Sequence, residues 1–141
     1  HRDLRRQRQM CIRDRAKINL KTKELEWAGA NNPLILIQNN ELKEIKGDHQ
    51  AINYTDNAEP FTNHNLSLNS GDRLYMFSDG YADQFGGPKQ KKFMYGAFKK
   101  LFLAMATEPI KNQKQIMYDT FMDWKGDLEQ IDDVCVIGIQ V

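Results

Sequence analysis

The chain has 141 residues, of which 40% are hydrophobic and 28% are charged, and its formal net charge at pH 7 is +1. This composition is that of an ordinary soluble globular protein, and the length suits one domain with one core. The nearly neutral charge argues against a nucleic-acid partner, and no apolar run approaches the ~20 residues that span a membrane.

The first residues differ from the rest in composition. Residues 1–15 contain six arginines, while the following 126 residues contain only Arg73. Their formal charge is +4 (six basic minus two acidic), against −3 for the remainder (14 basic minus 17 acidic). The segment lacks the serines and apolar periodicity of a transit peptide. We therefore expect residues 1–16 to be a non-native-looking or disordered head, of which residues 1–15 pack against nothing.

The first half of the remaining chain predicts short antiparallel strands. A strand at residues 17–20 turns back into residues 24–28, where Leu25 and Trp27 alternate with polar positions. Residues 34–37 are wholly apolar, and Asn39-Asn40 suits a two-residue turn into a strand at residues 41–45. The small residues of the loop at 28–32 fit a structural turn or a contact at a site. His64 has no carboxylate at a metal-binding spacing, which favours a half-exposed strand residue.

A buried strand is predicted again at residues 74–77, where four apolar residues follow Gly71-Asp72. Ser78-Asp79-Gly80 comes directly after it, so a carboxylate stands where a core strand leaves the sheet. Two interpretations are open for Asp79. Asp-Gly after a strand is a strong hairpin signal, and a carboxylate at this place also suits a bound cation.

The C-terminus predicts a second core strand that begins with a carboxylate pair, Asp132-Asp133, and holds Cys135 in its buried interior. If this strand runs antiparallel to residues 74–77 in one sheet, Asp79 and Asp132 share a rim. Carboxylates that converge there repel each other unless a metal ion or a shared proton holds them.

Two helices are expected between these strands. An apolar stripe runs from Met94 to Met105 at helical spacing, and a second helix follows, capped by Thr107, with Pro109 in its first turn and Gly126 at its end. Helices inserted between antiparallel strands favour an α+β fold, in which helices cover one face of a mainly antiparallel sheet.

The joint pattern resembles a known family. The sequences WAGANNPLILI (27–37), LYMFSDGYADQFGG (74–87) and WKGDLEQIDDVCVIGI (124–139) are similar to the C-terminal half of a SpoIIE-like, PPM-type metal-dependent serine/threonine phosphatase domain. The resemblance implies that residues 17–141 are the C-terminal part of an αββα sandwich that is incomplete here. The family's remaining metal-site residues lie in a Gly-Asp strand motif and a DxxGHG-type motif, and neither occurs in this chain.

The resemblance also implies the chemistry. Asp79 and Asp132 match the family's catalytic, metal-binding aspartates, and Asp133 is the less favoured alternative to Asp132. The cofactor would be Mn²⁺ or Mg²⁺ in a two-metal centre that activates water against a phosphomonoester. The expected partners are a phosphoprotein substrate and upstream sensor or regulatory domains, in bacterial signalling and in the cytoplasm, with no nucleic acid and no membrane contact.

Two other interpretations remain open. The chain is compatible with a non-catalytic interaction module that kept the fold and lost the chemistry. It is also compatible with a truncated chain without independent activity, which the foreign-looking head favours. In either case the isolated chain is expected to be weak or inactive as a phosphatase.

Overall fold

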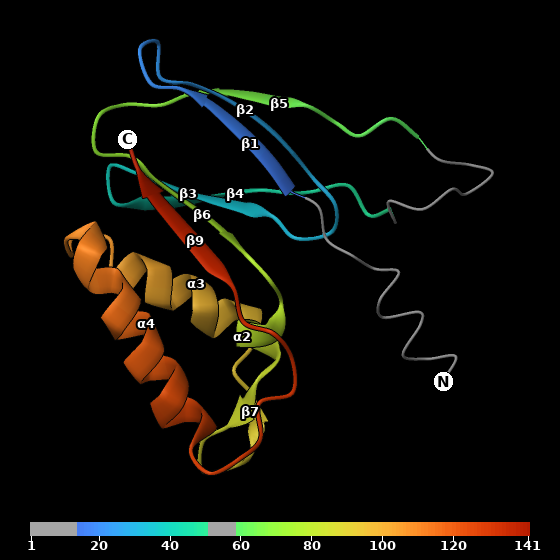
Figure 1. The fold of residues 1–141 in the computed structure, drawn as a ribbon, viewed down its shortest axis with the longest axis vertical. Helices are drawn as coiled ribbons and strands as arrows, with labels where there is room; N and C mark the ends of the chain where they lie inside the picture. Colours follow the sequence, from blue (N-terminus) through green and yellow to red (C-terminus); the bar gives the residue numbers. More distant parts are fainter. Residues whose placement is uncertain (1–13, 51–58) are drawn as a thin grey trace.

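A computed structural model describes residues 14–50 and 59–141. Its elements stack in three layers, a small sheet, a larger sheet and a pair of helices (Figure 1). The strands are β1 (Asp14–Asn19), β2 (Glu24–Gly29), β3 (Leu34–Gln38), β4 (Glu41–Ile45), β5 (His64–Ser67), β6 (Arg73–Phe77), β7 (Phe85–Gly86), β8 (Lys91–Lys92) and β9 (Val136–Gln140), and the helices are α2 (Gly80–Asp83), α3 (Tyr95–Ala104) and α4 (Ile110–Lys125).

Both main sheets are antiparallel, as the sequence predicts. The smaller has the order β1-β2-β5 and the larger β4-β3-β6-β9. The expected tight turn joins β3 to β4, because Asn39 and Asn40 adopt φ values of 51° and 61°, which asparagine tolerates better than most residues. The α+β fold class is therefore confirmed.

Side chains from the facing sides of the two sheets form one core cluster. Alternation along β2 points Leu25 and Trp27 inward, where both are fully buried, and the larger sheet supplies Leu34, Leu36 and Leu74. Burying a side chain of this size contributes about 1.5–3 kcal/mol each, so this cluster holds the two sheets face to face.

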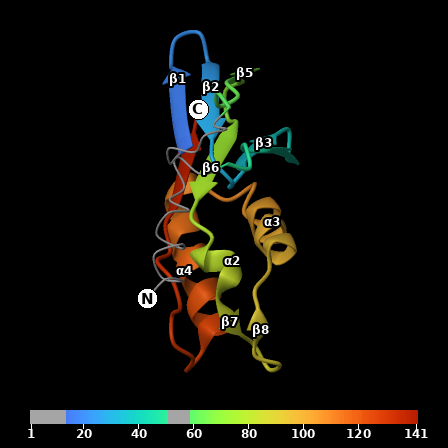
Figure 2. The same ribbon diagram turned by 90° about the vertical axis from the view of Figure 1, so that its right-hand side faces the viewer.

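The other face of the larger sheet is covered by α3 and α4 (Figures 1 and 2). Aromatic rings dominate this second cluster, and Tyr81 stacks on Phe98 with ring centroids 4.5 Å apart. Two sequence predictions fail at the helix ends. Met94 lies exposed before α3, and Pro109, not Thr107, occupies the N-cap position of α4, with no side-chain cap. Gly126 ends α4 with φ of 53°, as expected.

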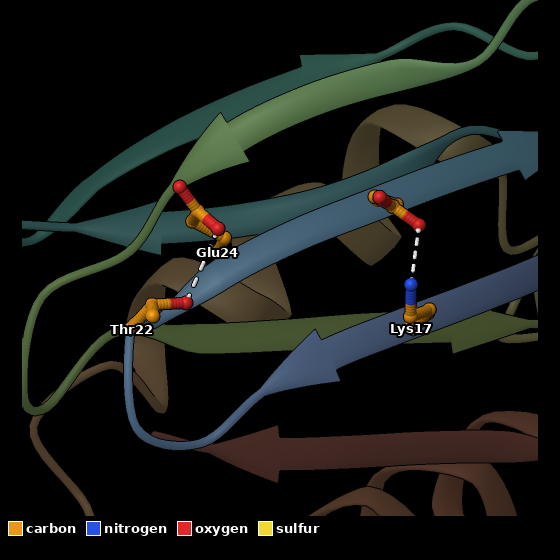
Figure 3. A network of polar contacts seen from close by, with 4 residues as sticks. Lys17, Thr22 and Glu24 are labelled. Carbon is orange, nitrogen blue, oxygen red and sulfur yellow. Dashed lines mark hydrogen bonds and ion pairs between the residues drawn. The ribbon is translucent and has the colours of Figure 1, made fainter.

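The outer face of the smaller sheet is polar. Lys17 and Glu26 form an ion pair across β1 and β2, with Nζ and Oε2 3.1 Å apart, and Thr22 donates to Glu24 in the adjoining turn (Figure 3). In the described residues no helix covers this face, so the arrangement is the expected αββα sandwich without one helical layer.

The boundary of the head differs from its prediction. β1 begins at Asp14, and Asp14, Arg15 and Ala16 pair with Gly29, Ala28 and Trp27 of β2. The expectation that the head packs against nothing is therefore wrong for these last residues, and the rest of it, residues 1–13, lies outside the described residues. Within the described part of the chain, no helix has both the length and the apolar character needed to cross a membrane.

Candidate metal centre

Antiparallel pairing of β6 and β9 brings the two predicted aspartates to one rim. Phe77 at the end of β6 lies opposite Val136 at the start of β9, and Ser78 N–H donates to the Cys135 carbonyl at 2.9 Å. Asp79 follows β6 directly, and Asp132 lies in the segment that leads into β9. The predicted shared rim is thus present, at the end of the larger sheet beside α2 (Figure 1).

The C-terminal strand itself differs from its prediction. β9 begins only at Val136, so Asp132 and Asp133 precede it in irregular backbone. The strand is largely exposed, with Ile137 49% accessible, and Cys135 is exposed as well. The apolar composition suggested a central strand, but β9 lies at the sheet's edge, where a neighbouring strand flanks it on one side only.

Asp79 does not form a hairpin turn. Its φ and ψ of −71° and −16° are helical, and it begins the single turn α2, in which Asp83 N–H donates to the Asp79 carbonyl at 3.0 Å. Gly80 is required for a close approach here, because a Cβ on it would lie 2.4 Å from the Asp133 carbonyl oxygen. The absence of a side chain lets the two aspartate segments touch.

Ser78 fastens the same two segments together. Its Oγ donates to the Asp133 carbonyl at 2.8 Å and accepts from Cys135 N–H at 2.9 Å. Asp132 in turn accepts from the Asp133 N–H through Oδ1 at 2.7 Å. These bonds define the path of the segment that carries Asp132.

Replacing Ser78 by alanine is expected to remove both bonds and to lower the free energy of unfolding by about 1–2 kcal/mol, since each is an ordinary neutral hydrogen bond. Urea unfolding followed by circular dichroism measures this. Ser67→Ala, on the exposed face of β5, is the control and should change the midpoint little. Equal midpoints for both variants would contradict the fastening role.

The electrostatics of the rim fit a cation. Partial burial raises the pKa of Asp79 above its ordinary value, and repulsion from the Asp132 and Asp83 carboxylates raises it further, while its own backbone N–H and the Lys92 ammonium oppose the rise. The Asp132 and Asp83 carboxylates therefore lie close enough to repel the Asp79 carboxylate.

The loop at residues 28–32 reaches the same rim in a structural role. Asn32 Nδ2 donates to the Phe77 carbonyl at 2.9 Å, at the last residue of β6. Asn31, with φ of 69°, donates its backbone N–H to the Asp48 carbonyl at 2.9 Å. The interpretation of this loop as a structural turn is the one that these bonds favour.

A comparison with models of known protein families shows to which family the chain belongs. The family model described as Stage II sporulation protein E (SpoIIE) matches residues 4–141. The chain belongs to the SpoIIE family. A comparison with curated protein sequences gives no significant match.

Solved structures show that this SpoIIE-family chain has the fold of a PP2C-type phosphatase domain. It is similar to the "SiaA-PP2C domain of Pseudomonas aeruginosa", with 24% identity and a TM-score of 0.82 over 92% of this chain and 51% of that one. It is also similar to the phosphatase domain of SpoIIE from Bacillus subtilis, "Mn presoaked", with 18% identity and a TM-score of 0.68 over 92% and 56% of the two chains.

A third match, at 17% identity and a TM-score of 0.67, is the structure of the RsbU and RsbW domains of Rv1364c from Mycobacterium tuberculosis, covering 89% of this chain and 34% of that one. The SpoIIE-family chain thus spans about half the length of the first structures it matches.

The donor set of the SpoIIE-family chain fits part of a metal site. Carboxylate oxygens are the ligands that Mg²⁺ and Mn²⁺ prefer, and the mutual repulsion of Asp79 and Asp132 is what a divalent cation relieves. Among residues 14–50 and 59–141, however, no group of three or more His, Cys, Asp or Glu residues is placed to hold a metal ion. The two aspartates alone leave most coordination positions unfilled.

Sequence reasoning missed one residue at this rim, Lys92. Its Nζ lies 3.0 Å from Oδ1 of Asp83, which together with Asp79 and Asp132 forms the acidic cluster at this rim. The signal available was the turn-forming run from Gly87 to Gln90, after which β8 pairs back onto β7.

Proposed function

We propose that the chain is the C-terminal part of a metal-dependent protein serine/threonine phosphatase, which hydrolyses phosphomonoesters of a phosphoprotein in bacterial signalling. The observation that carries the proposal is the joint placement of Asp79 and Asp132 at one rim, fastened by Ser78 and the close approach at Gly80. Membership of the SpoIIE family and the PP2C-type fold support the same reaction.

Asp79 and Asp132 would hold the cations of a Mn²⁺ or Mg²⁺ centre, and Asp133 would be the alternative to Asp132. The bound ions supply an activated water and neutralise the charge on the phosphoryl oxygens. The residues around Asp79 and Asp132 determine where the two carboxylates lie. Asp79 follows the end of β6 directly, whereas Asp132 lies in irregular backbone that the Ser78 hydrogen bonds to Asp133 and Cys135 tie to β6.

The proposal extends to partners and place of action. A phosphoprotein substrate and upstream sensor or regulatory domains fit a family whose solved members include a SpoIIE phosphatase domain with a fragment of its regulatory domain. The structure that contains RsbU together with RsbW gives a second example of such a combination. A cytoplasmic location suits this signalling role.

Asp79→Asn and Asp132→Asn are each expected to weaken Mn²⁺ binding by about tenfold or more, because each removes a charged ligand from a site with few. Electron paramagnetic resonance of free Mn²⁺ measures the change. Asp119→Asn on α4, whose carboxylate bonds Gln115, is the control and should bind like the unaltered chain. Unchanged affinity in both rim variants would favour the non-catalytic interaction module.

A further inference from the structure

Lys92 lies beside the candidate metal centre but on β8, an element that carries neither Asp79 nor Asp132. Its Nζ is 3.0 Å from Oδ1 of Asp83, which is one helical turn after Asp79 and donates its backbone N–H to the Asp79 carbonyl. The ammonium is also the cation that acts on the Asp79 carboxylate, against the repulsion of its acidic neighbours. The side chain therefore adds positive charge to an otherwise acidic rim.

The backbone around Lys92 is fixed independently of this ion pair. Phe93 N–H donates to the Gln84 carbonyl and Met94 N–H to the Ala82 carbonyl, both at 2.9 Å, so the chain after β8 runs along α2. These bonds place Lys92 against α2 whatever its side chain does.

The β7–β8 hairpin is anchored to α4 as well. Trp124 Nε1 donates to the Gln84 carbonyl at 3.0 Å, and its own carbonyl accepts from Gly87 N–H at 2.9 Å. Gly86 and Gly87 leave room for this contact, since a Cβ on Gly86 would lie 1.8 Å from the Trp124 carbonyl oxygen. Figure 2 shows the hairpin at the end of the molecule away from β1 and β2, with α2 between the hairpin and β6.

The stability of the folded chain gives only a small reason for a lysine at position 92. Its Nζ lies 6.0 Å from the centroid of the Phe85 ring, and an exposed cation–π contact contributes about 0.5–1 kcal/mol. The side chains of Lys92 and Asp83 are each 43% accessible, and exposed ion pairs of this kind contribute between about zero and 1 kcal/mol. A lysine ammonium has three donors, and one of them bonds Asp83. Among the described residues the other two donors make no hydrogen bond, and the side chain is partly open to solvent.

We infer that Lys92 contacts a phosphoryl oxygen of the bound substrate beside Asp79, which makes it a substrate-binding residue of the proposed phosphatase, on which this inference rests. A phosphomonoester dianion approaching Asp79, Asp132 and Asp83 is repelled by three carboxylates. Metal ions offset part of this charge, and a positioned ammonium offsets more while it orients the phosphoryl group through a charge-assisted hydrogen bond.

The test uses the 141-residue chain and phenylphosphonate, a phosphoryl compound that cannot be hydrolysed, in the presence of Mg²⁺. Nuclear magnetic resonance titration should shift the amide signals of β8 and α2, and Lys92→Gln should raise the dissociation constant by about tenfold. Lys92→Arg keeps the charge and should stay within about threefold. Lys91→Gln, at the exposed neighbour whose side chain alternates to the other face, should match the unaltered chain.

The outcomes separate this inference from the proposed function. Equal affinity for Lys92→Gln and Lys91→Gln, or absence of shifts in β8, would overturn the role of Lys92, even in a protein that hydrolyses phosphate esters. Binding that depends on Lys92, together with absence of hydrolysis by a longer protein that also carries the remaining acidic ligands, would overturn the phosphatase and leave the phosphoryl contact standing.

Discussion

The 141-residue chain on its own should hydrolyse a generic aryl phosphate in Mn²⁺ at least about 100-fold more slowly than the same chain joined to the sequence that precedes it in its gene. Two carboxylates leave a Mn²⁺ ion mostly hydrated and loosely placed. Misplacement of a reacting group by about 1 Å can cost a factor of ~10² in rate.

The reason lies in how much of the site the chain carries. It spans about half of the SiaA and SpoIIE structures that it matches, and its described residues hold no group of three or more potential ligands. The resemblance places the remaining ligands in motifs that this sequence lacks. Steady-state release of the aryl alcohol, followed by absorbance, measures the difference.

The matched control is Asp79→Asn in the longer protein, which should be as inactive as the short chain. Robust turnover by the 141-residue chain, abolished by Asp79→Asn, would show that these residues build a complete site. Inactivity of the longer protein would instead favour a module without chemistry.

Gly80→Ala should have the largest effect on stability of any single methyl group added at this rim. The new Cβ would lie 2.4 Å from the Asp133 carbonyl oxygen and 3.0 Å from its carbon, and both are backbone atoms that cannot rotate away. Overpacking of this kind costs about 1–3 kcal/mol, and we expect the upper end, with a fall in melting temperature of about 10 °C. Differential scanning calorimetry measures it.

Gly96→Ala provides the control for this substitution. Gly96 lies in the first turn of α3, and a Cβ there meets no atom within 4 Å, so alanine should be neutral or stabilise the helix by up to about 1 kcal/mol. Gly80→Ala should also weaken Mn²⁺ binding, because relief of the overlap moves Asp133 and with it Asp132. A melting temperature equal to that of Gly96→Ala would contradict the close approach.

Local patterns predicted much of the fold because the physics behind them is local. The alternation of apolar and polar residues predicted which face of β2 is buried. Asn39-Asn40 predicted the turn between β3 and β4, because asparagine tolerates positive φ. Helical spacing located α3 and α4. The convergence of Asp79 and Asp132 followed from one assumption about strand direction, which the pairing of β6 with β9 confirms.

The sequence predictions failed where the outcome depends on the position of a segment in the fold and not on its local sequence. An apolar sequence such as VIGIQ in β9 occurs both at the edge and in the centre of sheets. The exposure of Ile137, and of Cys135 just before the strand, therefore could not be predicted from the sequence of this segment. Asp79-Gly80 suited a hairpin equally well, and only the packing of Gly80 against Asp133 selects the helical turn. The position of Lys92 depends on the β7–β8 hairpin, in which Gly86 and Gly87 pack closely against Trp124 of α4, far away in the sequence.

The chain has two tryptophans, and they lie in different parts of the molecule. Trp27 is fully buried between the sheets, and Trp124 is partly exposed against the β7–β8 hairpin. Indole emission depends on solvent contact, so Trp27 is expected to emit at a shorter wavelength than Trp124 and to be quenched less by iodide. Replacing either by phenylalanine makes fluorescence a separate optical probe of the sandwich and of the hairpin that carries Lys92.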